Sequence, residues 1–259
     1  MIMKKFLGIM IASVLLVVLA ACGNGTSSSG EKVLRVGATG QSFPNSFKEG
    51  DKLVGYDVEV LEAVAKNLGY KVEWTLTDFS GLMGQLEAGK LDTIANNVAV
   101  TDERKKVYNF TDKYSVLGTQ VAVRSDNNEI NTLDDLKGKT ISAVLGSNNV
   151  KNFKAWDTKG EVTLKTYETR ESAMNEVITG KVDGYINAST TLLAEIAKGK
   201  LPLKLVGDPI SHDDVSFPFA RTEQGEKLLK EFNTELQKLR NDGTLLKISK
   251  KYYGEDVTQ

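Results

Sequence analysis

Cysteine and histidine are nearly absent from this 259-residue chain, which has one of each, Cys22 and His212. A single cysteine excludes an internal disulfide, and one cysteine with one histidine cannot supply the ligands of a structural zinc site. No Gly-x-Ser-x-Gly nucleophile elbow is present, although His212 beside Asp213 leaves a Ser–His–Asp arrangement open. We therefore expect no metal, no cofactor and no catalytic residue, and a fold that depends on its hydrophobic core.

Long apolar runs are also scarce, and the clearest one lies at the N-terminus. Lys4 and Lys5 precede an apolar stretch over residues 6–19, which is shorter than the roughly 20 residues of a membrane-spanning helix. The pattern predicts a signal peptide over residues 1–21. The following Leu-Ala-Ala-Cys resembles a bacterial lipobox, which implies a lipid anchor on Cys22 at the extracytoplasmic face of the cell membrane. Secretion with a free thiol is the alternative.

Residues 22–31 have almost no apolar side chains and are rich in Gly, Ser, Asn and Thr. Such a composition cannot bury a core and is typical of a flexible tether. The segment predicts a folded body held close to the membrane.

Charge of one sign does not dominate the body. Without Lys4 and Lys5, 31 basic side chains remain against 34 acidic ones, a net charge of about −3. No basic run is left, so nucleic acid is not an expected partner. The body from about Val33 to Gln259 is long enough for one large domain or two medium ones.

Strand-like and helix-like segments alternate along the body, which is typical of α/β folds with parallel sheets. The expected strands are residues 33–37, 72–76, 93–96, 119–123, 140–144, 162–166, 182–186 and 203–206. The expected helices are residues 57–68, 80–88, 101–106, 148–157, 170–179 and 189–198, followed by a long helix capped by Thr222 and a last helix from Thr244 to Tyr253.

An internal repeat indicates two similar lobes. The spacing of Leu82-Met83, Leu86, Gly89-Lys90-Leu91-Asp92 and Asn96 recurs at Ala173-Met174, Val177, Gly180-Lys181-Val182-Asp183 and Asn187. Each copy predicts a helix ended by a left-handed glycine and a strand that carries an asparagine at its end. Coincidence of common α/β patterns is the alternative.

The chain is expected to cross between the lobes twice, near residues 118–124 and 210–219. We therefore expect one lobe from residues 32–120 and 216–259 and a second lobe from residues 121–215. Paired crossings would form a hinge, with a ligand cleft between the lobes.

Gly55-Tyr56-Asp57-Val58-Glu59-Val60 begins an amphipathic helix whose apolar face is expected in the core and whose acids suit the helix N-terminus. As an ordered string it resembles the signature of bacterial family 3 solute-binding proteins, the polar-amino-acid-capturing subunits of ABC importers. The resemblance implies a two-lobed, type II periplasmic-binding-protein-like fold, a monomer, and partnership with a permease and its ATPase. We expect no ligand contact from this helix.

A carboxylate-binding site is expected in Asn96-Asn97-Val98-Ala99-Val100-Thr101-Asp102-Glu103-Arg104. Backbone N–H groups near Asn97 and Ala99 follow a strand, and Arg104 offers a planar fork suited to a carboxylate. A surface arginine beside acidic neighbours is the alternative. The stretch also resembles the carboxylate clamp of the family, with Arg104 at the position of the family's arginine.

Ser147 and Asn148 follow a predicted strand of the second lobe. Ser147 can cap the next helix while its hydroxyl faces the cleft, or it can act as a cap alone. The family resemblance implies that this loop contacts the ligand carboxylate from the second lobe.

Aromatic ligand walls are common in the family. Phe79 occupies one such position, and Phe43 lies beside the other, where alignment places Ser42; a core role is the alternative for each phenylalanine. The family's ammonium-binding aspartate corresponds to Ala188, so Asn187 and backbone carbonyls, or Asp213 or Asp214, must serve instead.

Three segments resemble those of Gram-positive cystine-binding lipoproteins: Gln41-Ser42-Phe43-Pro44, Asp78-Phe79-Ser80-Gly81-Leu82-Met83 and Leu145-Gly146-Ser147-Asn148-Asn149. The resemblance implies L-cystine as the ligand. Glutamine or another polar amino acid is the first alternative. A ligand-sensing or adhesive surface lipoprotein, and an extracytoplasmic enzyme such as a dehydratase, are alternatives of other classes.

Overall fold

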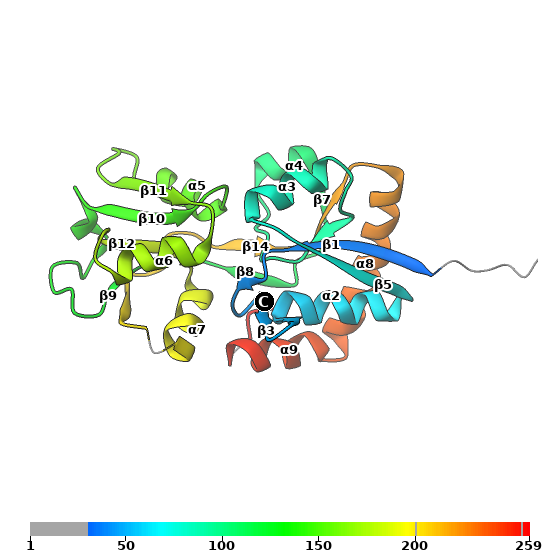
Figure 1. Cartoon of the computed structure of the whole chain (residues 1–259). Coiled ribbons are helices and arrows are strands. Elements are labelled where there is room, and N and C mark those ends of the chain that lie inside the picture. Colours follow the sequence, from blue (N-terminus) through cyan, green and yellow to red (C-terminus); the bar gives the residue numbers. More distant parts are fainter. Residues whose placement is uncertain (1–30, 200, 255) are drawn as a thin grey trace, which may run out of the picture. The chain divides into compact units, whose positions relative to one another are not determined.

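The computed structural model describes residues 31–199, 201–254 and 256–259. The chain divides into two units, residues 1–32 and residues 33–259. The expected signal peptide, the lipidated Cys22 and most of the tether lie outside the described residues, so those expectations stay predictions. The unit of residues 33–259 is an α/β structure in two lobes (Figure 1).

The first lobe is built around a three-stranded sheet in the order β5 (Tyr70–Leu76), β1 (Lys32–Ala38), β6 (Thr93–Ile94). Three helices contact one another beside it: α2 (Tyr56–Asn67), α8 (Glu223–Asn241) and α9 (Thr244–Tyr253). Their apolar faces bury Val60, Leu61, Phe232 and Leu236 in one cluster with strand β1. The two C-terminal helices thus return to the N-terminal lobe, as Figure 1 shows.

The rest of this lobe comprises short elements. An antiparallel ribbon of β2 (Gln41–Ser42), β3 (Ser46–Glu49) and β4 (Lys52–Val54) precedes α2. Helices α3 (Phe79–Glu87) and α4 (Asp102–Val107) flank β6, and β7 (Tyr108–Phe110) pairs with β15 (Pro218–Ala220). The ribbon was not expected, because strands of two to four residues show too few alternations to be recognised.

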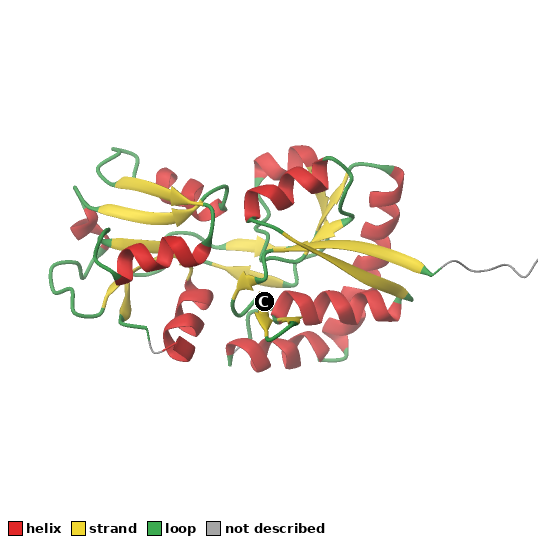
Figure 2. Cartoon of the chain, viewed as in Figure 1, coloured by secondary structure: helices red, strands yellow, loops and turns green. Residues whose placement is uncertain are grey.

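The second lobe contains a five-stranded sheet in the order β11 (Thr163–Tyr167), β10 (Thr140–Val144), β12 (Gly184–Ala188), β9 (Thr119–Arg124), β13 (Leu203–Val206). Helices α5 (Asn148–Trp156), α6 (Arg170–Ile178) and α7 (Ser189–Gly199) contact its strands, and a short 3₁₀ helix, η1 (Leu133–Leu136), follows β9. Figure 2 shows the helices beside the strands in both lobes.

The expectation of a wholly parallel sheet is wrong for the second lobe. Strand β10 runs parallel to β11 and β12, whereas β9 runs antiparallel to β12 and β13. The reason is the direction in which the chain enters the sheet of the second lobe. Strand β9 starts at the pocket end because the chain has just crossed from the first lobe, while the other strands are reached through helices or loops of the second lobe.

The crossing consists of two short strands, β8 (Ser115–Leu117) and β14 (Asp213–Val215), which pair antiparallel with Leu117 opposite Asp213. Thr119 already belongs to β9, so the first paired crossing lies slightly earlier in the sequence than expected. Val215 also bridges to Ala99 in the first lobe. The borders assigned to the lobes at residues 120 and 215 stay a prediction.

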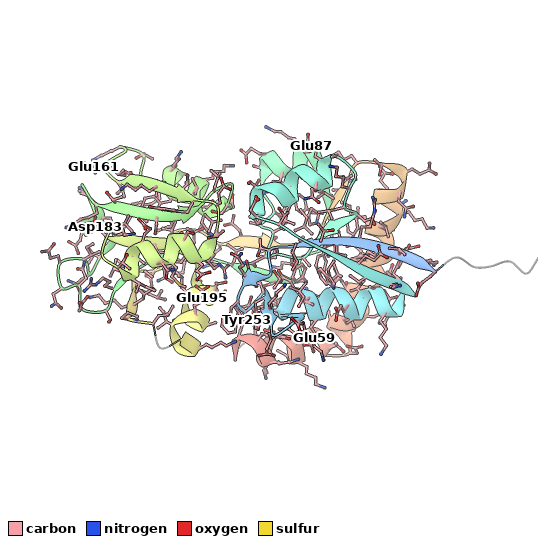
Figure 3. The ribbon with its side chains drawn as sticks, viewed as in Figure 1. Glu59, Glu87, Glu161, Asp183, Glu195 and Tyr253 are labelled. Carbon is pink, nitrogen blue, oxygen red and sulfur yellow. The ribbon has the colours of Figure 1, made fainter. Side chains whose placement is uncertain are left out.

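The internal repeat has a structural counterpart. Gly89 and Gly180 both have left-handed backbones, with φ of 68° and 73°. Asp92 accepts a hydrogen bond from the Arg35 N–H at 2.8 Å, and Asp183, labelled in Figure 3, accepts one from the Thr140 N–H at 2.7 Å. In each copy the aspartate after the helix therefore fixes the start of the neighbouring strand.

No helix within residues 31–199, 201–254 and 256–259 is long and apolar enough to cross a membrane.

Candidate functional site

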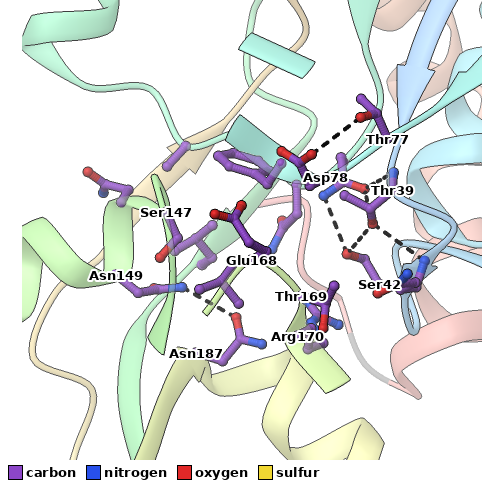
Figure 4. A pocket seen from close by; sticks show the side chains of 18 of the residues that line it. Thr39, Ser42, Thr77, Asp78, Ser147, Asn149, Glu168, Thr169, Arg170 and Asn187 are labelled. Atoms are coloured by element: carbon purple, nitrogen blue, oxygen red, sulfur yellow. Dashed lines mark hydrogen bonds between the residues drawn. The ribbon is translucent and has the colours of Figure 1, made fainter. Parts of the chain in front are cut away.

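A pocket of about 110 Å³ lies between the two lobes beside the hinge strand β8 (Figure 4). Polar side chains dominate its wall, with few apolar ones. The first lobe contributes Thr39, Gln41, Ser42, Thr77, Asp78, Phe79, Asn96, Asn97, Ala99 and Arg104, and β8 contributes Leu117. The second lobe contributes Val144, Ser147, Asn148, Asn149, Glu168, Thr169, Arg170 and Asn187.

The structure brings together eight of the nine residues expected to bind ligand. They come from loops far apart in the sequence and line this one pocket: Gln41, Phe79, Asn97, Ala99, Arg104, Ser147, Asn148 and Asn187. Phe43 is placed elsewhere. Ligand contact by each of these residues stays a prediction.

Arg104 lies in the first turn of α4, where the Arg104 N–H donates to the Thr101 hydroxyl at 3.2 Å. Its guanidinium donates to the carbonyl of Ala99 at 2.8 Å and, across the pocket, to the carbonyl of Gly146 at 3.3 Å. It also lies 5.5 Å from the centre of the Phe79 ring. Burial lowers the pKa of Arg104, yet a guanidinium stays protonated in proteins. The side chain is therefore held in place as a cation.

Arg104 has no ion-pair partner in the part of the chain that the structure describes. A partly buried cation without an anion is costly to desolvate, and its donors fit a carboxylate. The surface arginine that the sequence left open as an alternative does not match this burial.

Ser147 is the N-cap residue of α5, but its side chain makes no capping bond. The Ser147 hydroxyl oxygen is buried and has no hydrogen-bond partner among the described residues. The adjacent N–H groups of α5 form the positive end of the helix dipole. The hydroxyl and the helix end are thus both available to an anionic group in the pocket.

The first-lobe side of the pocket is held by Asn96. Its side-chain oxygen accepts hydrogen bonds from the Thr39 N–H and hydroxyl, both at 2.9 Å, and from the Ser46 hydroxyl at 2.6 Å. Its amide nitrogen donates to the Ser42 hydroxyl at 3.3 Å. This network fixes the loop after β1 through side chains of the first lobe itself.

Asp57 holds another loop on the first-lobe side of the pocket. It is fully buried at the N-terminus of α2 and accepts a hydrogen bond from the N–H of Asn97, a pocket residue with a left-handed backbone of φ 54°. Burial raises the pKa of Asp57 to about 7, against the effect of the bond from Asn97. The expectation that the acids of α2 serve only the helix end is therefore wrong for Asp57, which positions a pocket loop.

Phe43 lies beside Phe47, with ring centres 4.9 Å apart, and Lys198 of the second lobe lies over both rings. These residues line a second cavity of about 590 Å³, which shares Gln41 and Arg170 with the pocket. Phe79 is the one aromatic residue among the described residues that line the pocket itself.

Arg170 is the main residue that sequence reasoning missed. Its guanidinium donates to the Phe43 carbonyl at 2.8 Å and pairs with Glu195 at 3.1 Å, and both charged side chains are nearly buried. Burial raises the pKa of the Glu195 carboxyl, and Arg170 opposes that rise. Extending the internal repeat toward the N-terminus would have found Arg170, because it occupies the position that Phe79 has in the first copy.

Direct contacts already join the two sides. Besides the bonds of Arg104 and Arg170, the Asn45 amide donates to the Thr191 hydroxyl at 3.1 Å, and Lys151 pairs with Glu103. The two lobes are therefore in direct contact through several side chains around the pocket.

Comparison with known proteins assigns the family. The sequence profile of the bacterial extracellular solute-binding proteins, family 3, matches residues 34–255. The chain belongs to this family.

Three similar proteins illustrate the relationship. The probable amino-acid-binding protein YxeM of Bacillus subtilis is 55% identical over 258 residues, which cover 99% of this chain and 97% of that protein. The L-cystine-binding protein TcyA of the same organism is 33% identical and covers 99% and 100%. The solved structure of an ancestral arginine-binding protein bound to glutamine has a TM-score of 0.80 and 33% identity, covering 86% of this chain and 98% of that one.

In this family 3 protein, the position expected to bind the ligand ammonium group has no side chain that can do so. Ala188 lies buried in β12 and packs into the core of the first lobe, so the position offers no polar group. Asp213 accepts hydrogen bonds from Asn152 and Ser211, and Asp214 pairs with Lys113. Neither aspartate lines the pocket.

Proposed function

We propose that the chain is the substrate-binding lipoprotein of an amino-acid ABC importer and that L-cystine is its ligand. Membership of the solute-binding family and the amino-acid-binding names of its relatives support the transport role. The proposal includes a diacylglyceryl anchor on Cys22, a monomeric body without cofactor or enzymatic activity, and delivery to a permease driven by an ATPase.

The observation that carries the proposal is that Arg104 and Ser147 both line the pocket. Among the described residues, a guanidinium without an anion and a buried hydroxyl without a partner line the same pocket, from opposite lobes. A carboxylate satisfies both at once, and each charge-assisted bond contributes about 1.5–3 kcal/mol. An amino-acid carboxylate bound there would tie the first lobe to the second.

Transport then follows from differential affinity. A ligand that touches both lobes binds the closed arrangement more tightly than an open one and shifts the population toward it. The paired strands β8 and β14 are the segment that such a motion must bend. In our proposal the permease recognises the closed, loaded form.

Support for L-cystine comes from the relative TcyA and from a wall rich in amide and hydroxyl groups. Glutamine is the second candidate, because the similar ancestral protein was solved bound to glutamine. A polar wall with little net charge suits both ligands, and Phe79 can pack against either side chain.

A thermal-unfolding screen of the purified full-length chain tests the proposal. A ligand at about 100 times its Kd stabilises a protein by about 2.7 kcal/mol, which is readily seen as a rise in Tm. L-cystine should raise Tm, and the other amino acids should raise it less. A rise with L-glutamine and none with L-cystine would overturn the ligand assignment.

The transport role has its own test. Deleting the gene should abolish uptake of labelled L-cystine, and the wild-type gene should restore it. Unchanged uptake would favour a ligand-sensing or adhesive surface protein instead.

A further inference from the structure

Four charged side chains line the pocket in the described part of the chain: Asp78, Arg104, Glu168 and Arg170. Arg170 is already neutralised by Glu195 at 3.1 Å. The charges that remain for a ligand therefore depend on the hydrogen bonds and ion pairs of Asp78, Arg104 and Glu168.

Asp78 is committed to its own helix. One carboxylate oxygen accepts hydrogen bonds from the Gly81 N–H at 2.6 Å and the Ser80 hydroxyl at 2.7 Å, which caps α3. The other accepts a longer bond from the Thr77 hydroxyl at 3.4 Å. These bonds lower the pKa of Asp78, led by the bond from Gly81. The carboxylate therefore serves the helix N-terminus.

Glu168 has no comparable engagement. Its carboxylate makes no hydrogen bond and no ion pair with any of the residues that the structure describes. In Figure 4 its side chain projects into the space between the two sides of the pocket. Asp78 also lacks an ion-pair partner in the described chain, but its carboxylate is hydrogen-bonded within its own lobe. Among the described residues that line the pocket, Glu168 is thus the carboxylate with neither a counter-ion nor a hydrogen bond, and Arg104 is the cation without a counter-ion.

The backbone brings Glu168 close to the Ser147 loop. Strands β10 and β11 are parallel neighbours with Val144 opposite Tyr167, and the Leu145 N–H donates to the Tyr167 carbonyl at 2.8 Å. Glu168 follows Tyr167 directly, so it leaves the sheet beside the loop that carries Ser147. An amino-acid ligand has its carboxylate and ammonium on one carbon atom, so its ammonium lies next to the carboxylate site, where an anion would neutralise it.

We infer that Glu168 binds the α-ammonium group of the ligand, in the role that Ala188 cannot fill. The inference rests on the proposed function and adds its specificity determinant. Arg104 and Ser147 take the carboxylate, Glu168 takes the ammonium, and the pocket thereby selects zwitterions over plain carboxylic acids. An ammonium left without a partner in this pocket would be costly to bury.

Calorimetric titration of the full-length protein tests this assignment with two probes, L-cystine and 3,3′-dithiodipropionate. The second probe keeps the disulfide and both carboxylates and lacks both amino groups. Wild type should bind L-cystine at least about tenfold more tightly than the diacid. Glu168→Gln should weaken L-cystine binding by about 10- to 100-fold and leave the diacid nearly unchanged. Glu168→Asp should restore part of the preference.

Glu171→Gln is the matched control, because it removes the same charge from an exposed position on α6 that lines the second cavity and not the pocket. It should leave both affinities unchanged. Since Glu168 is exposed and makes no hydrogen bond or ion pair with the residues that the structure describes, its variants should unfold at the Tm of unliganded wild type. If L-cystine does not bind to wild type, the same titrations use L-glutamine and 4-carbamoylbutanoate.

The outcomes separate the two claims. Wild-type affinity in Glu168→Gln, or equal losses for the amino acid and its des-amino analogue, would overturn the role of Glu168 and leave the proposed function standing. Failure of wild type to bind either amino acid would overturn the proposed function, and the assignment of Glu168 with it.

Discussion

The two sides of the pocket each contain a copy of the same helix–strand repeat, yet they differ in which polar groups the protein itself leaves unsatisfied. On the first-lobe side Asn96 is fully engaged with Thr39, Ser42 and Ser46. On the second-lobe side the Ser147 hydroxyl and the Glu168 carboxylate have no partner in the described chain. The first side is preorganised, whereas the second presents groups that only a ligand can satisfy.

This difference indicates how the roles are divided. A preorganised side binds without further ordering cost, while unsatisfied groups on the other side gain most when the ligand joins them. Arg104 connects the two, because it belongs to the first lobe and donates to Gly146 of the second. Four substitutions can break or sharpen the comparison.

Arg104→Ala should have the largest effect. Loss of two charge-assisted bonds to a carboxylate should weaken amino-acid binding by about 100-fold or more in calorimetric titration. Lys105→Ala is the control, since Lys105 is the exposed neighbour whose ion pair, to Asp102 at 3.8 Å, contributes little. Equal affinities in the two variants would place the carboxylate elsewhere.

Asp57→Asn should change the pH dependence of stability. The folded-state pKa of Asp57 is raised to about 7, so the folded state binds more protons than the unfolded state between the unfolded pKa and that value. Stability must therefore fall as pH rises through this window, by at most about 1.4 kcal/mol per pH unit. Asparagine can keep the bond from Asn97 without a charge.

Denaturant unfolding at pH 5 and pH 8 measures the Asp57 contribution. Wild type should lose more stability than Asp57→Asn between the two values. Identical slopes for the two proteins would show that the Asp57 carboxyl titrates normally and that its burial has no such effect.

Asn96→Ala tests the preorganised side. It leaves the Thr39 N–H and the Ser46 hydroxyl without their acceptor, and an unsatisfied buried group costs about 1–3 kcal/mol. Denaturant unfolding should show a loss in that range, with weaker ligand binding. Asn187→Ala, the equivalent change in the second copy, should cost less stability if the comparison holds. Asn187 makes three side-chain hydrogen bonds, from the Ala188 N–H, from Asn149 at 3.3 Å and to the Tyr185 hydroxyl at 2.7 Å, whereas Asn96 makes four.

Ser147→Ala should have the smallest effect on stability and a selective effect on binding. Because the hydroxyl makes no capping bond, its removal should leave the free energy of unfolding unchanged while ligand affinity falls by about three- to tenfold. Thr222→Ala is the contrasting case, since Thr222 caps α8 through the Gly225 N–H and its loss should cost about 1 kcal/mol. A similar stability loss in both variants would mean that Ser147 acts as a cap.

Much of the fold could be predicted because local patterns determine it. Strands β10 and β13 have the expected bounds, and the two C-terminal helices begin after the expected Thr222 cap and the expected Gly243 stop. Turn glycines and caps are local signals, and each marks an element end within a residue or two. Strand β12 starts later than expected, because Val182 and Asp183 still belong to the turn that follows Gly180.

What the sequence missed depends on partners far away along the chain. The reversed direction of β9 follows from how the chain crosses between the lobes through β8 and β14. Asp57 resembles an ordinary helix-end acid until its contact with Asn97 is seen. The placement of Phe43 outside the pocket and of Arg170 in its wall was missed for the same reason. Both positions depend on how α6 and α7 contact the ribbon of the first lobe.

A crystal structure of the protein with L-cystine tests the central claim most directly. The account predicts one ligand carboxylate within hydrogen-bonding distance of both the Arg104 guanidinium and the Ser147 hydroxyl, with the side chain against Phe79. A ligand bound in the second cavity beside Phe43 and Lys198, with Arg104 still unpaired, would contradict it.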